Sequence, residues 1–172
     1  LVRALAVPSY VLPAPTQVVA ALWSDRGALM SHSAVTVLEA LGGMGISLLC
    51  AVLLGILMDA NETVKSIVYP VLVVTQTIPM IVLSPILILY LGFGLAPKIL
   101  TVVLMCFFPI VVSFADGMGQ IDPAYGNLVR SYGGTKLQVY TQVKIPYAMP
   151  SLLSGLKVAA TYSISGAVVG EW

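Results

Sequence analysis

Three long stretches of this sequence contain no acidic or basic side chain, and they constrain the fold more than any other feature. They run from 40 to 58, from 66 to 97 and from 99 to 115. A helix needs about 20 apolar residues to cross the roughly 30 Å of a bilayer's hydrocarbon core. A fourth stretch, 150–172, carries only Lys157 and Glu171, both near its ends. We therefore expect an all-α, polytopic transmembrane helix bundle with spans at about 34–58, 67–91, 98–115 and 150–172.

The composition supports a lipid environment. Apolar residues make up 59% of the chain and charged residues 9%, with a mean hydropathy of +1.00, whereas about a quarter of a soluble domain is charged. The net charge of +1 provides no basic surface for nucleic acid. Cys50 and Cys106 both lie inside apolar runs, so no disulfide, metal site or cofactor is expected. The bilayer is the first expected partner.

Residues 1–33 are expected to form an external segment with a short interfacial helix. Thr16 can cap a helix that reaches Trp23, and tryptophan suits a membrane interface. The chain begins at Leu1 and stops at Trp172 within or beside an apolar stretch. We expect the transmembrane domain, 34–172, to be incomplete at both ends.

Small residues recur every four positions in two of the expected spans. Such a row forms a shallow stripe on one helix face, where a neighbouring helix can approach closely. The stripes indicate protein-facing surfaces and hence a bundle. Their members are Gly43, Ser47, Ala51 and Gly55 in the first span and Ser151, Gly155, Ala159, Ser163 and Ala167 in the last, where Glu171 continues the row.

The expected span at 67–91 contains three prolines and cannot be a regular helix throughout. Thr75, Gln76 and Thr77 lie just before Pro79. Two interpretations stay open: a kinked helix whose polar groups bond to neighbouring helices, or a segment that lines or gates a passage. Two interpretations also stay open for Glu171: it lies at the external mouth of that passage, or it bonds to a neighbouring helix.

No enzymatic site is indicated. His32 is the single histidine, and the glycines around Gly43 are not followed by the Gly-Lys-Ser/Thr that cradles phosphates. We therefore expect neither ATP binding nor catalysis from this chain. The long polar loop, 116–149, lies on the side with five of the eight Lys and Arg residues, which favours a cytoplasmic position.

That loop predicts two short helices, 125–132 and 136–143. Gly133 and Gly134 permit a sharp turn between them, and Pro146 is expected to stop the second. Leu137, Tyr140 and Val143 would share one side of a compact knob that can enter a groove on a soluble partner.

The loop resembles the Glu-Ala-Ala loop of binding-protein-dependent ABC permeases. In that family Glu-Ala-Ala is followed by three residues, Gly, nine residues, Ile, one residue and Leu-Pro. Here Gly133 and Pro146 keep the spacing, while Asn127 replaces the glutamate and Val129 the second alanine. The resemblance implies that a separate ATPase subunit grips the knob and hydrolyses ATP. The implied contact residues are Asn127, Arg130, Gly133, Leu137, Tyr140, Val143 and Pro146.

The resemblance covers nearly the whole chain. Ile78-Pro79, Leu91-Gly92-Phe93-Gly94 and Phe107-Phe108-Pro109 are similar to the nitrate, sulfonate and taurine branch, and equally to permeases for pyrimidine precursors of thiamine. It implies a bacterial inner-membrane importer with six spans, one missing at each end. The implied partners are the ATPase, an extracytoplasmic substrate-binding protein and a second permease copy, expected as a homodimer.

Two other classes stay open. An ion-driven secondary transporter would need acids within its spans or paired repeats of broken helices, and we identify neither in this sequence. A membrane scaffold without transport activity would need the small-residue stripes but not the knob.

Overall fold

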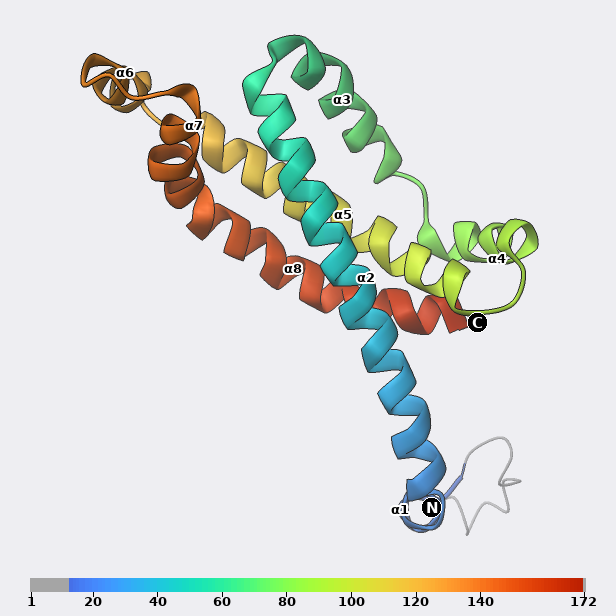
Figure 1. Cartoon of the computed structure of the whole chain (residues 1–172). Helices are drawn as coiled ribbons and strands as arrows, with labels where there is room; N and C mark the ends of the chain where they lie inside the picture. Colours follow the sequence, from blue (N-terminus) through green and yellow to red (C-terminus); the bar gives the residue numbers. More distant parts are fainter. Residues whose placement is uncertain (1–12, 172) are drawn as a thin grey trace. The chain divides into compact units, whose positions relative to one another are not determined.

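The computed structural model describes residues 13–171, which form helices and no strand (Figure 1). The order is α1 (Pro15–Ser24), α2 (Arg26–Ala60), α3 (Glu62–Thr75), α4 (Met80–Leu91), α5 (Leu95–Gly119), α6 (Pro123–Ser131), α7 (Lys136–Val139), the π-helix η1 (Tyr140–Lys144) and α8 (Ile145–Glu171). The predicted all-α fold class is confirmed. Residues 1–12 and Trp172, the outer ends of the predicted segments 1–33 and 150–172, lie outside the described residues.

The chain divides into two compact units, residues 1–37 and 38–172. In the first unit α1 begins at Pro15, so the predicted cap at Thr16 is wrong. Proline suits the first helical position because its fixed φ already matches the helix. The N–H of Ala14 donates to Gln17 Oε1 at 2.9 Å, and the Arg26 guanidinium lies 5.0 Å from the Trp23 ring centroid.

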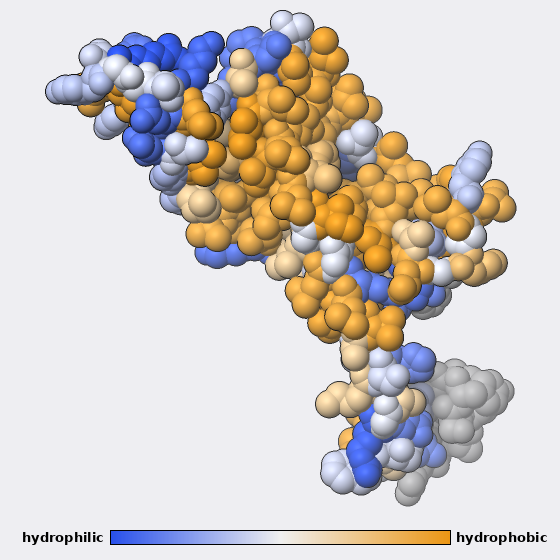
Figure 2. All heavy atoms as spheres, viewed as in Figure 1, coloured by the Kyte–Doolittle hydropathy of each residue, from blue (hydrophilic) through white to orange (hydrophobic). Residues whose placement is uncertain are grey.

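Three continuous helices of the described chain are long and apolar enough to cross a membrane: α2, α5 and the helix that runs from α7 through α8. The fourth stretch is broken, since α3 and α4 meet at an angle of 99°. The sequence prediction that this stretch is irregular agrees with the observed break, which lies between Thr75 and Met80. Figure 2 shows apolar residues over most of the visible helical surface.

Helix α5 packs closely against both α2 and α8. On α2, a Cβ added at Gly43 would lie 2.6 Å from Val102 of α5. On α8, a Cβ added at Gly155 would lie 2.5 Å from the Pro109 carbonyl oxygen of α5. The structure buries the predicted packing residues Gly43, Ser47, Ala51, Gly55, Gly155, Ala159 and Ser163. Close backbone approach therefore depends on the missing side chains of these glycines.

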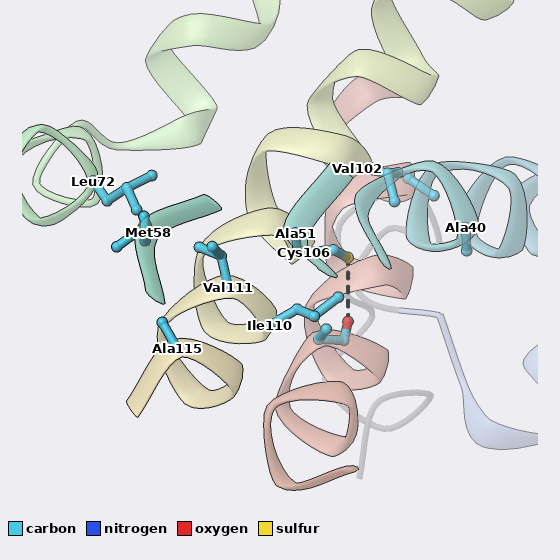
Figure 3. Close-up of a cluster of buried hydrophobic side chains, with 11 residues drawn as sticks. Ala40, Ala51, Met58, Leu72, Val102, Cys106, Ile110, Val111 and Ala115 are labelled. Carbon is cyan, nitrogen blue, oxygen red and sulfur yellow. Dashed lines mark hydrogen bonds between the residues drawn. The ribbon is translucent and has the colours of Figure 1, made fainter. Parts of the chain in front are cut away.

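Polar side chains bond directly to backbone carbonyls across these helix contacts. Ser47 Oγ donates to the Val103 carbonyl at 2.9 Å, and Cys106 Sγ donates to the Ala159 carbonyl at 3.3 Å (Figure 3). Ser84 Oγ of α4 donates to the Val169 carbonyl of α8 at 3.0 Å. Each of these groups would be costly if left without a partner in hydrocarbon. These hydrogen bonds therefore fix the register in which the helices pack as well as which helices are in contact.

Buried apolar side chains fill the spaces between α2, α3 and α5. Met58 and Leu72 lie in the same cluster as Val111 and Ala115 (Figure 3). A smaller cluster around Phe114, Met118 and Ala148 joins α5 to the start of α8. The first cluster extends along the bundle to Ala40, Val102 and Ala167, whereas the second lies at the end where α6 and α7 lie.

Substituting Gly155 tests the close approach of α5 and α8. Gly155→Ala should lower the free energy of unfolding in detergent by about 1–3 kcal/mol, because the new methyl group would overlap the Pro109 carbonyl oxygen and the Ser113 side chain of α5. Gly45→Ala on α2 is the matched control, since nothing lies within 4 Å of its added Cβ. Equal effects of the two substitutions would contradict the assigned packing.

Candidate functional site

The first part of the candidate site is a helical knob formed by α6, α7 and η1, residues 123–144. Helix α6 begins where Asp122 Oδ1 accepts from the Ala124 N–H at 2.8 Å. It ends at a turn in which Gly133 has φ of 82° and the Gly134 N–H donates to the Val129 carbonyl at 2.9 Å. Gly133 supplies the left-handed conformation that other residues rarely adopt. The predicted turn at these two glycines is observed.

The second helix of the knob starts at a capping box. Thr135 Oγ1 accepts from the Gln138 N–H at 3.3 Å, and Gln138 Oε1 accepts from the Thr135 N–H at 2.7 Å. The prediction that Pro146 stops this helix is wrong, because the helix continues into α8. The π turn η1 explains the difference: the Ile145 N–H bonds to the Tyr140 carbonyl five residues back. This wider turn accommodates the missing donor of Pro146 within a continuous helix.

The outer surface of the knob carries large apolar side chains among polar ones. Tyr132 is 86% exposed and Leu137 is 71% exposed, and Tyr125 and Leu128 are also exposed. Among the other predicted contact residues, Asn127, Arg130, Gly133 and Pro146 are exposed, whereas Val143 is half-buried. Hydrophilic residues gather over the knob in Figure 2.

Tyr140 departs from its predicted place on the outer surface. Its hydroxyl donates to Asp59 Oδ2 of α2 at 2.7 Å, and Lys144 Nζ lies 2.6 Å from the same oxygen. The Lys144 ammonium also lies 5.2 Å from the Tyr140 ring centroid. Sequence reasoning missed Asp59, and no local signal could have identified it, since 81 positions separate it from Tyr140.

The second part of the candidate site is the break between α3 and α4. Thr75, Gln76, Thr77 and Pro79 all lie at this break and are exposed. Thr75 Oγ1 and Thr77 Oγ1 each donate to a carbonyl three residues back, at 2.8 Å. A cavity of about 330 Å³ adjoins Thr75 and Gln76 and is otherwise lined mainly by α5, with Tyr162 of α8.

A charged cluster lies at the end of the bundle away from the knob. Lys98 Nζ of α5 is 3.2 Å from Glu39 Oε1 of α2 and 3.7 Å from Glu171 Oε1 of α8. Of the two places considered for Glu171, the structure shows the contact with a neighbouring helix. Glu39 is 2% exposed, which corrects the expectation that no span contains a buried acid. Glu39 was not identified as a buried acid from the sequence because the charge-free run 40–58 begins one residue after it.

No group of three or more potential metal-ligating side chains occurs among residues 13–171. Asp59 instead pairs with Lys144, and Glu39 and Glu171 share Lys98. The arrangement therefore provides interaction surfaces and a break in a span, and it offers no assembled set of catalytic groups in the described residues.

Comparison with known proteins gives a consistent family. Residues 43–172 match the family model described as the inner membrane component of binding-protein-dependent transport systems. The formylaminopyrimidine transport permease protein of Halalkalibacterium halodurans is 37% identical over 164 residues, 95% of this chain and 66% of the relative. A probable ABC transporter permease protein of Haemophilus influenzae is 32% identical, over 96% of this chain and 67% of the relative.

A more distant relative extends the range of named substrates. The taurine transport system permease protein of Escherichia coli is 26% identical, over 93% of this chain and 61% of its own length. The chain thus spans about two thirds of the length of the curated relatives it matches. These relatives are named as transport permeases, and the predicted family and inner-membrane location are confirmed. The chain belongs to the binding-protein-dependent transport system inner membrane components, the permeases of ABC transporters.

Proposed function

We propose that this chain is part of the permease subunit of an ABC importer, in which a separate ATPase binds the knob from the cytosol. The observation that carries the proposal is the set of exposed apolar side chains on the knob, with Tyr132 and Leu137 the most exposed. Large apolar side chains within a polar rim are typical of protein–protein interfaces. We expect these apolar side chains to contact protein rather than lipid, because the residues around them on the knob are hydrophilic.

The proposed ATPase contact centres on the outer face of the knob. Leu137 supplies an apolar anchor. Arg130 and Asn127 are exposed beside the cavity between the knob and α2 and would add polar contacts there. Gly133 shapes the turn that presents this face, and Pro146 and Val143 lie where the knob joins α8. Tyr140 acts from the inner side, through Asp59. ATP hydrolysis belongs to the partner.

We assign the break between α3 and α4 to the substrate pathway. Non-helical backbone at membrane depth is tolerated only where protein buries it or where it lines a watery cavity. Thr75, Gln76, Thr77 and Pro79 are exposed at the break, and a cavity of about 330 Å³ lies beside it. Glu171 lies at the charged cluster near the end of α8 and would influence the mouth of the pathway rather than its centre.

The remaining parts of the proposal follow from the family. Its relatives are named for the transport of formylaminopyrimidine and taurine, so the proposed cargo is a small polar solute of one of these kinds, a pyrimidine thiamine precursor or a small anion such as a sulfonate, taurine or nitrate. An extracytoplasmic binding protein would deliver it. A second copy of the permease would complete the pathway as a homodimer.

The buried acid Glu39 is the one observation that favours ion-driven transport instead. Lys98 lies 3.2 Å from one oxygen of Glu39 and also pairs with Glu171, so a cationic side chain already lies beside this acid, where a coupling ion would have to bind. A scaffold without transport activity would not require the exposed knob surface. The importer therefore accounts for more of the structure than either alternative.

A pair of substitutions at Gly133 tests the knob. Gly133→Val should weaken co-purification of the ATPase about tenfold, because a β-branched residue at positive φ is strained by about 1–2 kcal/mol or more. Gly133→Asn is the matched control, since asparagine tolerates this conformation. Membrane insertion should be unchanged in both. Equal ATPase binding by the two variants would contradict the proposed role of the knob.

Substitution of Gln76 tests the pathway. Gln76→Leu in the full-length protein should reduce uptake of the cargo several-fold while leaving ATPase binding intact, because it replaces an exposed polar group beside the cavity with an apolar one. Val74→Leu, an exposed position of α3 that does not line this cavity, is the control. Normal uptake by Gln76→Leu would remove the break from the pathway.

A further inference from the structure

The contact between α2 and the knob is concentrated on one carboxylate oxygen. Asp59 Oδ2 accepts from the Tyr140 hydroxyl at 2.7 Å and from Lys144 Nζ at 2.6 Å. The Asp59 side chain is 9% exposed, so water competes little for these bonds. Hydrogen bonds that involve charged groups are shorter and stronger than neutral ones. The two bonds therefore form a short link between separate parts of the chain.

The two donors of this link occupy special positions. Tyr140 is the first residue of the π turn η1 and Lys144 is the last, so together they span the junction of the knob and α8. Residues four apart lie on the same side of a helix, which lets both side chains reach one carboxylate. Asp59 is in the last turn of α2, at the end of a 35-residue helix.

An apolar cluster also packs next to this link and includes Ile56 of α2 and Ile145 of α8. A cavity of about 340 Å³ lies there, lined by Met58 and Asp59 of α2 and by Gly126, Asn127 and Val139 of the knob. Glu62, Lys65, Asp122 and Arg130 face the same cavity, and the described structure shows no ion pair for any of them. A hollow transmits force poorly, because its walls make no contact across it. Across this cavity, the polar link joins the knob directly to α2.

We propose that Asp59 is a positioning residue through which displacement of the knob is passed to α2. The assignment rests on the proposed function, since it is the ATPase that would move the knob. Without this link a displacement of the knob would reach α2 only indirectly, through α8, with which the knob is continuous, and the apolar cluster on which both helices pack. With it, α2 and α8 move together when the ATPase closes.

Asp59→Asn tests this assignment in the full-length permease, reconstituted in liposomes with its ATPase and binding protein. The variant removes the charge that holds Lys144. We expect ATPase co-purification and basal ATP hydrolysis within about twofold of the unmodified protein, and transport per ATP hydrolysed about tenfold lower, the change that loss of one charged hydrogen bond gives. Asp122→Asn is the matched control: it faces the same cavity and keeps its capping oxygen on the Ala124 N–H.

Tyr140→Phe provides a milder second variant that removes one hydroxyl group. It should lower the transport-to-hydrolysis ratio less than Asp59→Asn, and it should add little in the double variant, because the two residues act through the same bond. Normal ratios in both single variants would overturn the assignment. So would a loss of ATPase binding as large as the loss of transport, which would make Asp59 an assembly residue. An unmodified protein that binds no ATPase would instead overturn the proposed function.

Discussion

Close approach of helix backbones in lipid is the constraint on which the rest of this structure depends. Hydrocarbon tails are as apolar as leucine, so association of α2, α5 and α8 gains no hydrophobic driving force from expelling lipid. The gain comes from atomic contact, and contact at this distance requires glycine where Val102 or the Pro109 carbonyl oxygen lies opposite. The Cys106 and Ser47 bonds to facing carbonyls become possible because the backbones are so near.

The functional parts lie where this tight packing stops. Beside the break between α3 and α4 is a cavity of about 330 Å³, and beside the knob is one of about 340 Å³. A close-packed interior resists deformation, whereas a segment with few packed neighbours can change its position at lower cost. The helices α2, α5 and α8 are thus the close-packed part of the bundle, and the proposed pathway and the proposed ATPase contact lie beside its less densely packed regions.

Local features were predictable from the sequence, and contacts between distant segments were not. Charge-free runs identify spans because lipid penalises charge at every position, and Gly133 identifies a turn because its constraint is its own backbone. The prediction that Pro146 ends a helix is wrong because proline does so only when no wider turn accommodates it. Here the π turn η1 accommodates Pro146 within a continuous helix. The pairing of Asp59 with Lys144 depends on where α2 ends in space, which no local pattern specifies.

The ionic links that α2 makes through Glu39 and through Asp59 differ in length, and this difference has a mechanical consequence in the proposed importer. Glu39 and Asp59 are joined by about 30 Å of continuous helix. Lys144 holds Asp59 at 2.6 Å, whereas Lys98 lies 3.2 Å from Glu39 and is shared with Glu171 at 3.7 Å. Coulomb attraction falls with distance, and a shared cation binds each acid less tightly. Of these two ionic contacts, a pull at the knob would therefore weaken the one with Lys98 first.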